Sequence, residues 1–262
     1  MKTTSFNFRN LSLLLVIGIL ATSCMYINRL NGSGHVTKVE HKALFFNKLE
    51  LGIIFDAVII PSAEEKVIVE TDDNLQQYIL VKNEDSTLIV TTQEHVNIGH
   101  HSAGKVYIYT KGIEALTNSS VGKLSNEGTL NATNFVFNNS SVGSTDLKIE
   151  AKKITIDNSA VGKTNLYLKS DTLTLNNSAV GKMLLTGSTI LSTIDNSGVG
   201  KFDSQFLITQ VLHITNSGVG KCDISAEKEF YIVNSGVGKL DAYGSGVIKS
   251  LDDSGITKTS KH

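Results

Sequence analysis

Apolar and polar residues alternate with a period of two over most of the chain, which is the pattern of β-strands that bury one face. Residues 164–168 read Thr-Asn-Leu-Tyr-Leu, so that successive side chains would face the core and the solvent in turn. Valine, isoleucine, leucine and threonine dominate such stretches, and these residues favour strands. The pattern predicts an all-β protein.

A six-residue motif recurs through the second half of the chain. It reads NSSVGK, NSSVGS, NSAVGK or NSGVGK in seven copies, and each copy starts with an asparagine. These residues are Asn118, Asn139, Asn158, Asn177, Asn196, Asn216 and Asn234. They are spaced by 21, 19, 19, 19, 20 and 18 residues, and a weaker eighth copy, DSGITK, starts at Asp253. A short motif repeated at a near-constant interval predicts a solenoid with one coil per repeat.

The residues around the motif indicate the shape of each coil. Positions two before, three after and six after each asparagine are mostly apolar. Because odd and even positions of one straight strand face opposite sides, the chain must turn at Asn-Ser and again at the motif glycine, which tolerates positive φ. We therefore expect a parallel β-helix, a two-sided β-solenoid of about 19 residues per coil. We expect it to be right-handed, as parallel crossovers are as a rule.

Stacked coils would bring equivalent residues of successive repeats together. Val161, Val180 and Val199 should be immediate neighbours with inward side chains, about 4.8 Å apart. The seven motif asparagines should form an internal ladder in which each amide bonds to the next and so satisfies buried polar groups. We interpret this asparagine column as structural rather than as a binding site.

The chain before the motifs has the same character but less regularity. Residues 34–117 contain apolar runs at 44–46, 53–60 and 106–109, separated by polar turns. We predict that 34–117 form the N-terminal coils and cap of the same structure. Regular repeats would then span 118–256, and a short tail would span 257–262.

Both halves of the chain resemble one known family. The N-S-G-V-G turns at a 19-residue spacing, together with Gly32-Ser33-Gly34 and Leu44-Phe45-Phe46, resemble the putative auto-transporter adhesin, head GIN domain family. The resemblance covers roughly 34–256, although Ser33 stands where the family usually has asparagine. It implies a β-helix similar in shape to pectin-lyase-type proteins but without a recognised catalytic set. It also implies a secreted or lipid-anchored protein of Bacteroidetes-type bacteria.

Composition and charge narrow the classes of function. The 262-residue chain has a formal net charge of −1, no tryptophan and one proline. Its only arginines, Arg9 and Arg29, precede the repeats, so the body lacks the guanidinium groups that commonly hold phosphates. These features argue against a nucleic-acid binder, a helical bundle and a disordered chain.

The N-terminus has the features of an export signal. Lys2 and Arg9 precede a short apolar run at 11–20, and small residues lead to Cys24. This order resembles a bacterial lipobox, which implies a signal peptide over 1–23 and a lipid-modified Cys24 followed by a tether over 24–33. The alternative is an ordinary cleaved signal with an incidental cysteine. The lipoprotein interpretation predicts an outer-membrane lipoprotein of the cell envelope, at the periplasmic face or the cell surface.

A lysine follows most motif glycines and offers a candidate binding surface. The outward column contains Lys123, Lys163, Lys182, Lys201, Lys221 and Lys239. Lys163, Lys182, Lys201 and Lys221 are the candidates for binding a polyanion such as an acidic glycan. Asp146, Asp203, Asp223 and Asp241 would share the same outer face. The alternative is therefore a solvated surface of interleaved opposite charges.

No residue pattern indicates catalysis, a metal or a cofactor. His95, His100 and His101 cluster without further ligands nearby, and Cys222 belongs to an inward column where it would pack as a small apolar residue. We therefore expect no enzyme, and the first hypothesis is an adhesin or scaffold that contacts a glycan, an envelope polymer or another protein. Self-association by strand addition at the coil ends is also open. The alternatives are a polyanion-binding envelope protein and a carbohydrate-active enzyme.

Overall fold

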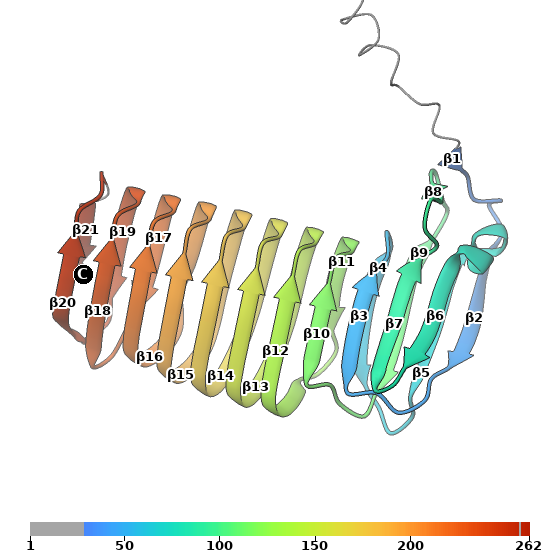
Figure 1. Cartoon of the computed structure of the whole chain (residues 1–262), viewed down its shortest axis with the longest axis horizontal. Helices are drawn as coiled ribbons and strands as arrows, with labels where there is room; N and C mark the ends of the chain where they lie inside the picture. The colour runs from blue at the N-terminus through green and yellow to red at the C-terminus, as the bar shows by residue number, and fades with distance from the viewer. Residues whose placement is uncertain (1–28, 257) are drawn as a thin grey trace, which may run out of the picture.

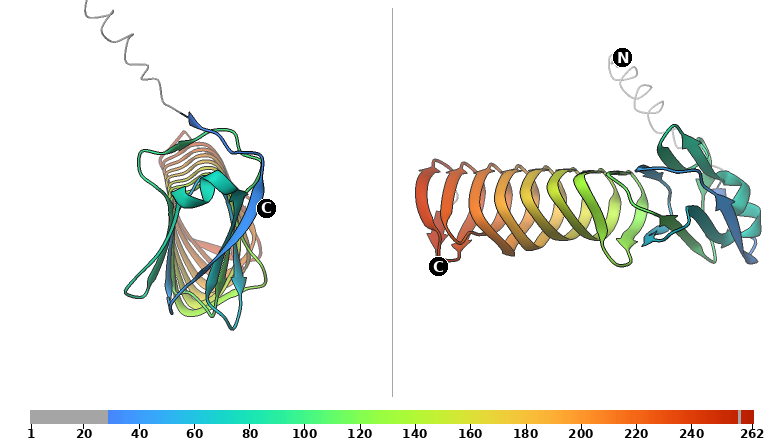
Figure 2. Two further views of the ribbon diagram at one scale, coloured as in Figure 1. Left: turned by 90° about the vertical axis from the view of Figure 1, so that its right-hand side faces the viewer. Right: turned by 90° about the horizontal axis from the view of Figure 1, so that it is seen from below.

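The protein is a rod of stacked β-coils with a cap at its N-terminal end (Figure 1). The computed structural model describes residues 29–256 and 258–262. In the central coils one long strand makes a whole turn: β13 (Val142–Asn158), β14 (Val161–Asn177), β15 (Val180–Asn196) and β16 (Val199–Asn216). Each bends midway, so that the rod has two sides when viewed along its axis (Figure 2). The predicted two-sided β-solenoid with coils about 19 residues apart is confirmed.

Two parallel sheets form the sides of the rod. The first sheet starts at the motif valines and is completed by β11 (Val121–Asn126), β17 (Val219–Ser225), β19 (Val237–Tyr243) and β21 (Lys258–Lys261). The second sheet ends at the motif asparagines and is completed by β10 (Ala115–Asn118), β12 (Leu130–Asn139), β18 (Glu229–Asn234) and β20 (Val247–Asp253). The sequence analysis assigned 257–262 to a tail, but Lys258–Lys261 pairs in parallel with β19 and so adds to the stack.

The register of the stack follows the repeat. Val161 pairs with Val180, and Val180 pairs with Val199, so equivalent motif positions lie directly above one another. One irregularity interrupts the first sheet, between Leu184 and Thr186 of β15, where β16 has one extra residue. The longer 20-residue spacing between Asn196 and Asn216 is accommodated there.

The core consists of inward columns of aliphatic and phenylalanine side chains. Leu147, Leu166 and Leu185 form one such column, and all three are almost fully buried. A buried leucine contributes about 1.5–3 kcal/mol relative to an exposed one. Because each side chain packs on its counterpart in the next coil, the repeat supplies its own core.

The N-terminal part continues both sheets and then closes them. In the second sheet β3 (Lys48–Gly52) and β7 (Thr87–Thr92) extend the stack in parallel, and in the first sheet β4 (Asp56–Pro61) and β9 (Gly104–Thr110) do the same. Beyond them β2 (Val36–Lys42), β5 (Lys66–Asp72) and β6 (Ile79–Glu84) pair in antiparallel fashion. A short pair, β1 (Arg29–Leu30) and β8 (Asn97–Ile98), lies beside them.

A short 3₁₀ helix covers the end of the core. The 3₁₀ helix η1 (Asp73–Tyr78) crosses the end of the rod, and its Leu75 is fully buried (Figure 2). An uncovered coil would expose apolar side chains, so this helix acts as the cap of the solenoid. In the described residues no helix is both long and apolar enough to span a membrane.

Candidate functional site

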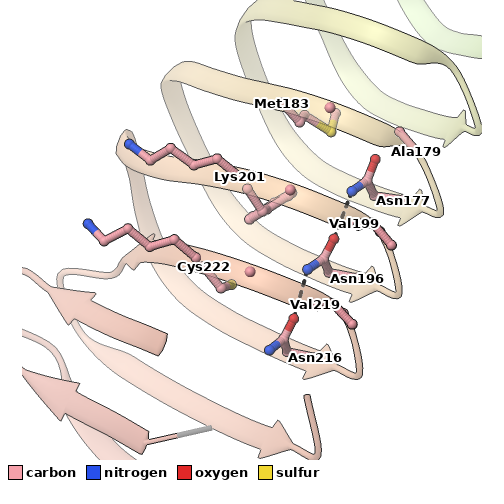
Figure 3. Close-up of a pocket in the computed structure, with 16 residues that line it drawn as sticks. Asn177, Ala179, Met183, Asn196, Val199, Lys201, Asn216, Val219 and Cys222 are labelled. Carbon is pink, nitrogen blue, oxygen red and sulfur yellow. Dashed lines mark hydrogen bonds between the residues drawn. The ribbon is translucent and has the colours of Figure 1, made fainter. Parts of the chain in front are cut away.

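The motif asparagines form a continuous ladder inside one corner of the rod. The side-chain nitrogen of Asn177 donates to the side-chain oxygen of Asn196 at 2.7 Å, and Asn196 donates to Asn216 at 2.7 Å (Figure 3). The same bond links all seven asparagines at 2.7–3.1 Å. Asn234 donates at 2.9 Å to Asp253, which needs only to accept. The ladder satisfies buried amides in the core, which is a structural role.

The motif glycine makes the corner possible. Gly181 has a φ of +135°, a backbone conformation that residues other than glycine rarely adopt. A Cβ at this position would also lie 2.0 Å from the carbonyl oxygen of Gly162 in the coil below. Both the backbone conformation and the close stacking of coils therefore require glycine.

The motif valines face solvent, which corrects one expectation from the sequence. Val161, Val180 and Val199 are immediate neighbours as expected, but their side chains point outward. All seven motif valines are 45–50% exposed. Buried and exposed positions follow the same alternation before and after the corner. The motif valine, three residues after the asparagine, therefore faces outward although valine is apolar. The result is an apolar stripe along one edge of the rod, the valine column: Val121, Val142, Val161, Val180, Val199, Val219 and Val237.

The lysine column runs beside the valine column on the first sheet. The register places Lys163, Lys182, Lys201 and Lys221 on successive coils. Asp203, Asp223 and Asp241 form a parallel column two residues further on, and these carboxylates are buried under the lysines.

Ion pairs link these two columns over the last coils. Lys201 contacts Asp203 at 2.6 Å and Asp223 at 3.2 Å, and Lys221 contacts Asp223 at 2.8 Å and Asp241 at 3.6 Å. Hydrogen bonds that the lysines donate to these carboxylates raise the pKa of both lysines, with Asp203 contributing most at Lys201 and Asp223 at Lys221. Two of the four candidate polyanion ligands are therefore already neutralised.

Asp241 is the last carboxylate in this series of ion pairs. Burial alone would raise the pKa of Asp241, but hydrogen bonds from Lys239 and His262 outweigh it and hold that pKa below its usual value. Lys239 lies 2.9 Å away and His262 lies 3.0 Å away. The carboxylate is thus kept ionised in the folded protein.

Lys163 and Lys182 differ from the other lysines of the column. Among the described residues no carboxylate lies within salt-bridge distance of either ammonium group. Asn165 and Leu184 stand where the later coils carry aspartates. The free positive charge of this surface is concentrated on these two coils.

The cysteine and histidine residues considered in the sequence have surroundings that indicate structural roles. Cys222 is buried in the core, and burial raises the pKa of its thiol. His101 packs against Phe55 with ring centroids 5.1 Å apart. In the part of the chain that the structure describes, no group of three histidine, cysteine or acidic residues is placed to hold a metal ion. Cys24 lies outside the described residues.

A buried carboxylate fixes the Gly-Ser-Gly segment to the cap. Asp72 accepts hydrogen bonds from the backbone of Gly34 at 2.6 Å and of Ser102 at 2.8 Å. Burial opposes ionisation of Asp72, but these backbone donors outweigh it and lower its pKa. Asp72 therefore has a structural role in which its carboxylate joins the segment at Gly34 to the loop at Ser102.

Two large apolar side chains on the outer surface were not expected from the sequence. Phe206 is 64% exposed and Ile208 is 55% exposed, both in the first sheet directly after the irregularity in β16. The 20-residue spacing of this repeat was the available signal, because one extra residue reverses the facing of all positions up to the next corner.

Comparisons with known proteins agree with this geometry. The family model described as putative auto-transporter adhesin, head GIN domain, matches residues 45–246. A search of curated proteins found no match.

Solved structures share the fold at low sequence identity. A putative adhesin from Parabacteroides merdae has a TM-score of 0.75 at 16% identity, over 89% of this chain and 99% of the other. A putative adhesin from Parabacteroides distasonis has a TM-score of 0.76 at 17% identity, with the same coverage of 89% and 99%. A protein from Parabacteroides distasonis, described as a putative lipid binding protein, has a TM-score of 0.72 at 16% identity, over 89% and 100%.

Proposed function

Because the chain belongs to the putative auto-transporter adhesin, head GIN domain family, we propose that it is a non-enzymatic adhesin of the cell envelope. It binds through the repeated outer surface of the solenoid rather than through a pocket. The observation that carries this proposal is the valine column, seven half-exposed valines in register along one edge.

The fold itself does not explain why these valines are repeated. The ladder needs asparagine and the corner needs glycine, but a half-exposed outward position can hold many residue types. A neighbouring outward column shows this freedom, since Lys148, Tyr167 and Thr186 occupy equivalent places on successive coils. An apolar residue retained at every exposed corner is typical of a contact surface.

The arrangement of carboxylates supports a non-enzymatic role. Asp203, Asp223 and Asp241 stack on successive coils, and lysines bind all three. An acid–base catalyst must reach substrate with a free proton or lone pair. Carboxylates that are buried under lysines act instead as structural ion pairs.

Adhesion of whole cells tests the proposal. Cells carrying the full chain should adhere to mucin-coated plates or to one another more than cells without it. Changing Val161, Val180 and Val199 to threonine preserves β-branching but removes the apolar surface, so adhesion should fall. Changing Val136, Val233 and Val247, exposed valines of the second sheet, to threonine is the matched control and should leave adhesion unchanged. Equal adhesion with and without the chain would reject the proposal.

We also propose that a lipid on Cys24 anchors the protein. The charged start, short apolar run and small residues before Cys24 support this. Several acyl chains, at about 0.8 kcal/mol per buried methylene, would hold the protein firmly in a membrane. A Cys24→Ser variant should leave the membrane fraction. If it stays there, the lipid anchor is refuted.

A second candidate function is polyanion binding by the lysine column, favoured by the uncompensated charges of Lys163 and Lys182. A double alanine variant of these two lysines should lose retardation by polygalacturonate in native gels. Lys152 and Lys153, two exposed lysines at the opposite bend, provide a control of equal charge. Equal retardation of both double variants would reject this candidate.

A further inference from the structure

The irregularity in β16 places two large apolar side chains on the outer surface. Leu184 pairs with Asp203 and Thr186 pairs with Phe206, so that Ser204 and Gln205 together oppose Leu185. This is a β-bulge, and it reverses which side chains face outward. Leu207 is buried as a result, and Phe206 and Ile208 are exposed. If alternation continued unbroken from Asp203 through the extra residue, Phe206 and Ile208 would be buried instead.

The exposed phenylalanine completes an aromatic pair. Tyr167 pairs with Thr186, and Thr186 pairs with Phe206, so the two rings stand in one outward column with a threonine between them. Tyr167 is 40% exposed. Two coil spacings separate the rings along the rod, about 10 Å, which is close to the length of a disaccharide unit.

Polar groups lie beside this column. A shallow hollow on the same sheet is lined by Asp146, Asn165, Tyr167, Leu184 and Thr186. The side-chain nitrogen of Asn165 donates to Asp146, which holds both side chains at the edge of the hollow. Aromatic rings next to amide, hydroxyl and carboxylate groups match a sugar ring, which has apolar C–H faces and hydroxyl edges.

The charges at the hollow are balanced. Asp146 contacts Lys123 at 3.4 Å, and the ammonium group of Lys148 lies 5.1 Å from the ring centroid of Tyr167. The two charged residues that line the hollow, Asp146 and Lys148, have opposite signs, so the lining itself has no net charge, in contrast to the lysine column around Lys163 and Lys182. The balance favours a neutral ligand.

We propose that the column of Tyr167, Thr186 and Phe206 is a binding site for a neutral glycan chain. Its sugar rings lie on Tyr167 and Phe206, and its hydroxyl groups reach Thr186 and Asp146. This inference rests on the proposed adhesin function and adds to the valine column a second contact surface on the first sheet, with its ligand class. The bulge is then the feature that creates the site, since it turns Phe206 outward.

Affinity electrophoresis of the full chain in detergent tests the proposal, with soluble mannan, dextran and laminarin as neutral probes. At least one should retard the wild-type protein. Tyr167→Ala and Phe206→Ala should each weaken retardation about 10-fold, the equivalent of about 1.4 kcal/mol. Phe206→Tyr should retain it. Tyr231→Ala removes an aromatic side chain from the second sheet and should bind like wild type. Unchanged melting temperatures of the surface variants would show that folding is intact.

Specific results would overturn the glycan site. These are no retardation by any neutral probe, or equal retardation of wild type and both alanine variants. Binding to phosphatidylglycerol vesicles that is lost in the same variants would also overturn it, because the patch would then face a membrane. The adhesin proposal is tested separately. If cells adhere through the valine column but the protein binds no neutral probe, the adhesin proposal stands and the glycan site is rejected.

Discussion

At the scale of single residues, the asparagine column shows how a polar side chain can be buried without loss. Each amide donates to the next coil and accepts from the previous one, so neither group is left unsatisfied. An unpaired buried group would cost about 1–3 kcal/mol. The stack is therefore held by polar as well as apolar contacts.

Removing one asparagine should break the ladder at two places. Asn177→Ala leaves the donor of Asn158 and the acceptor of Asn196 unpaired, so the free energy of unfolding should fall by about 2–5 kcal/mol. Chemical denaturation measures this loss. Asn176→Ala, one residue earlier but exposed, should cost less than about 0.5 kcal/mol. Similar losses in both variants would show that the ladder contributes little.

Asp241 should make stability depend on pH. Its folded pKa lies below the unfolded value, so the ionised group contributes stability above the unfolded pKa of about 3.9. That contribution is lost as pH falls through the folded pKa. The melting temperature of Asp241→Asn should therefore lie below that of wild type at pH 7, and the difference should shrink on acidification below about pH 4. A difference that stays constant with pH would contradict this assignment.

Residue type alone did not reveal which side chains face outward. The asparagine ladder could be predicted, because only a neighbouring amide satisfies a polar group repeated at every corner. Val161 was expected inside because valine is apolar, yet strand alternation places it outside. The position within the strand therefore outweighs the apolar character of the side chain at the corner.

At the scale of elements, the corner combines a strained backbone with close packing. Gly181→Ala would place a Cβ 2.0 Å from a backbone oxygen in addition to the cost of its positive φ. We expect loss of the folded state or destabilisation above about 3 kcal/mol. Thermal unfolding followed by circular dichroism measures it.

Gly34 allows the cost of a positive φ to be measured apart from the cost of close coil packing. It also has positive φ, +87°, but a Cβ there meets nothing within 4 Å. Gly34→Ala should therefore cost only about 1–2 kcal/mol, from the backbone conformation. An equal loss at Gly34 and Gly181 would show that coil packing is not the main constraint.

The bulge shows why a strand can be predicted from the sequence while the side chains that it exposes cannot. The 20-residue spacing from Asn196 to Asn216 shows that one residue is extra but not where it is inserted. Insertion between Asp203 and Phe206 exposes Phe206, whereas insertion at the lower bend would bury it. The candidate glycan site therefore depends on a local choice that the repeat pattern does not encode.

At the scale of the whole molecule, each coil contacts mainly its two neighbours. Deleting residues 159–177 removes one coil of 19 residues and joins Asn158 to Ser178, which restores the motif. The shortened protein should fold cooperatively with slightly lower stability. Small-angle scattering should show a rod shorter by about 5 Å.

A deletion that does not match the repeat is the control for this prediction. Removing residues 160–177 leaves one extra residue within the corner, between Asn158 and Val180. The corner is where the ladder and the glycine stack must both fit, so this variant should be much less stable. If both deletions fold equally well, the corner does not set the register.

The N-terminal cap was the least predictable part of the fold. The sequence analysis placed residues 34–117 in the same stack, and β3, β4, β7 and β9 do continue the sheets in parallel. The antiparallel pairing of β2, β5 and β6 has no repeat to indicate it. Long-range strand order in such a region depends on tertiary contacts, which local alternation does not specify.

The asparagine ladder also gives the rod an electrical direction. Every side-chain N–H of the row points toward the C-terminal end, so the amide dipoles add instead of cancelling. Their positive pole meets Asp253, whose negative charge is favourable there in the same way as an anion at the start of an α-helix. An asparagine at this terminal position would complete the row without neutralising its pole.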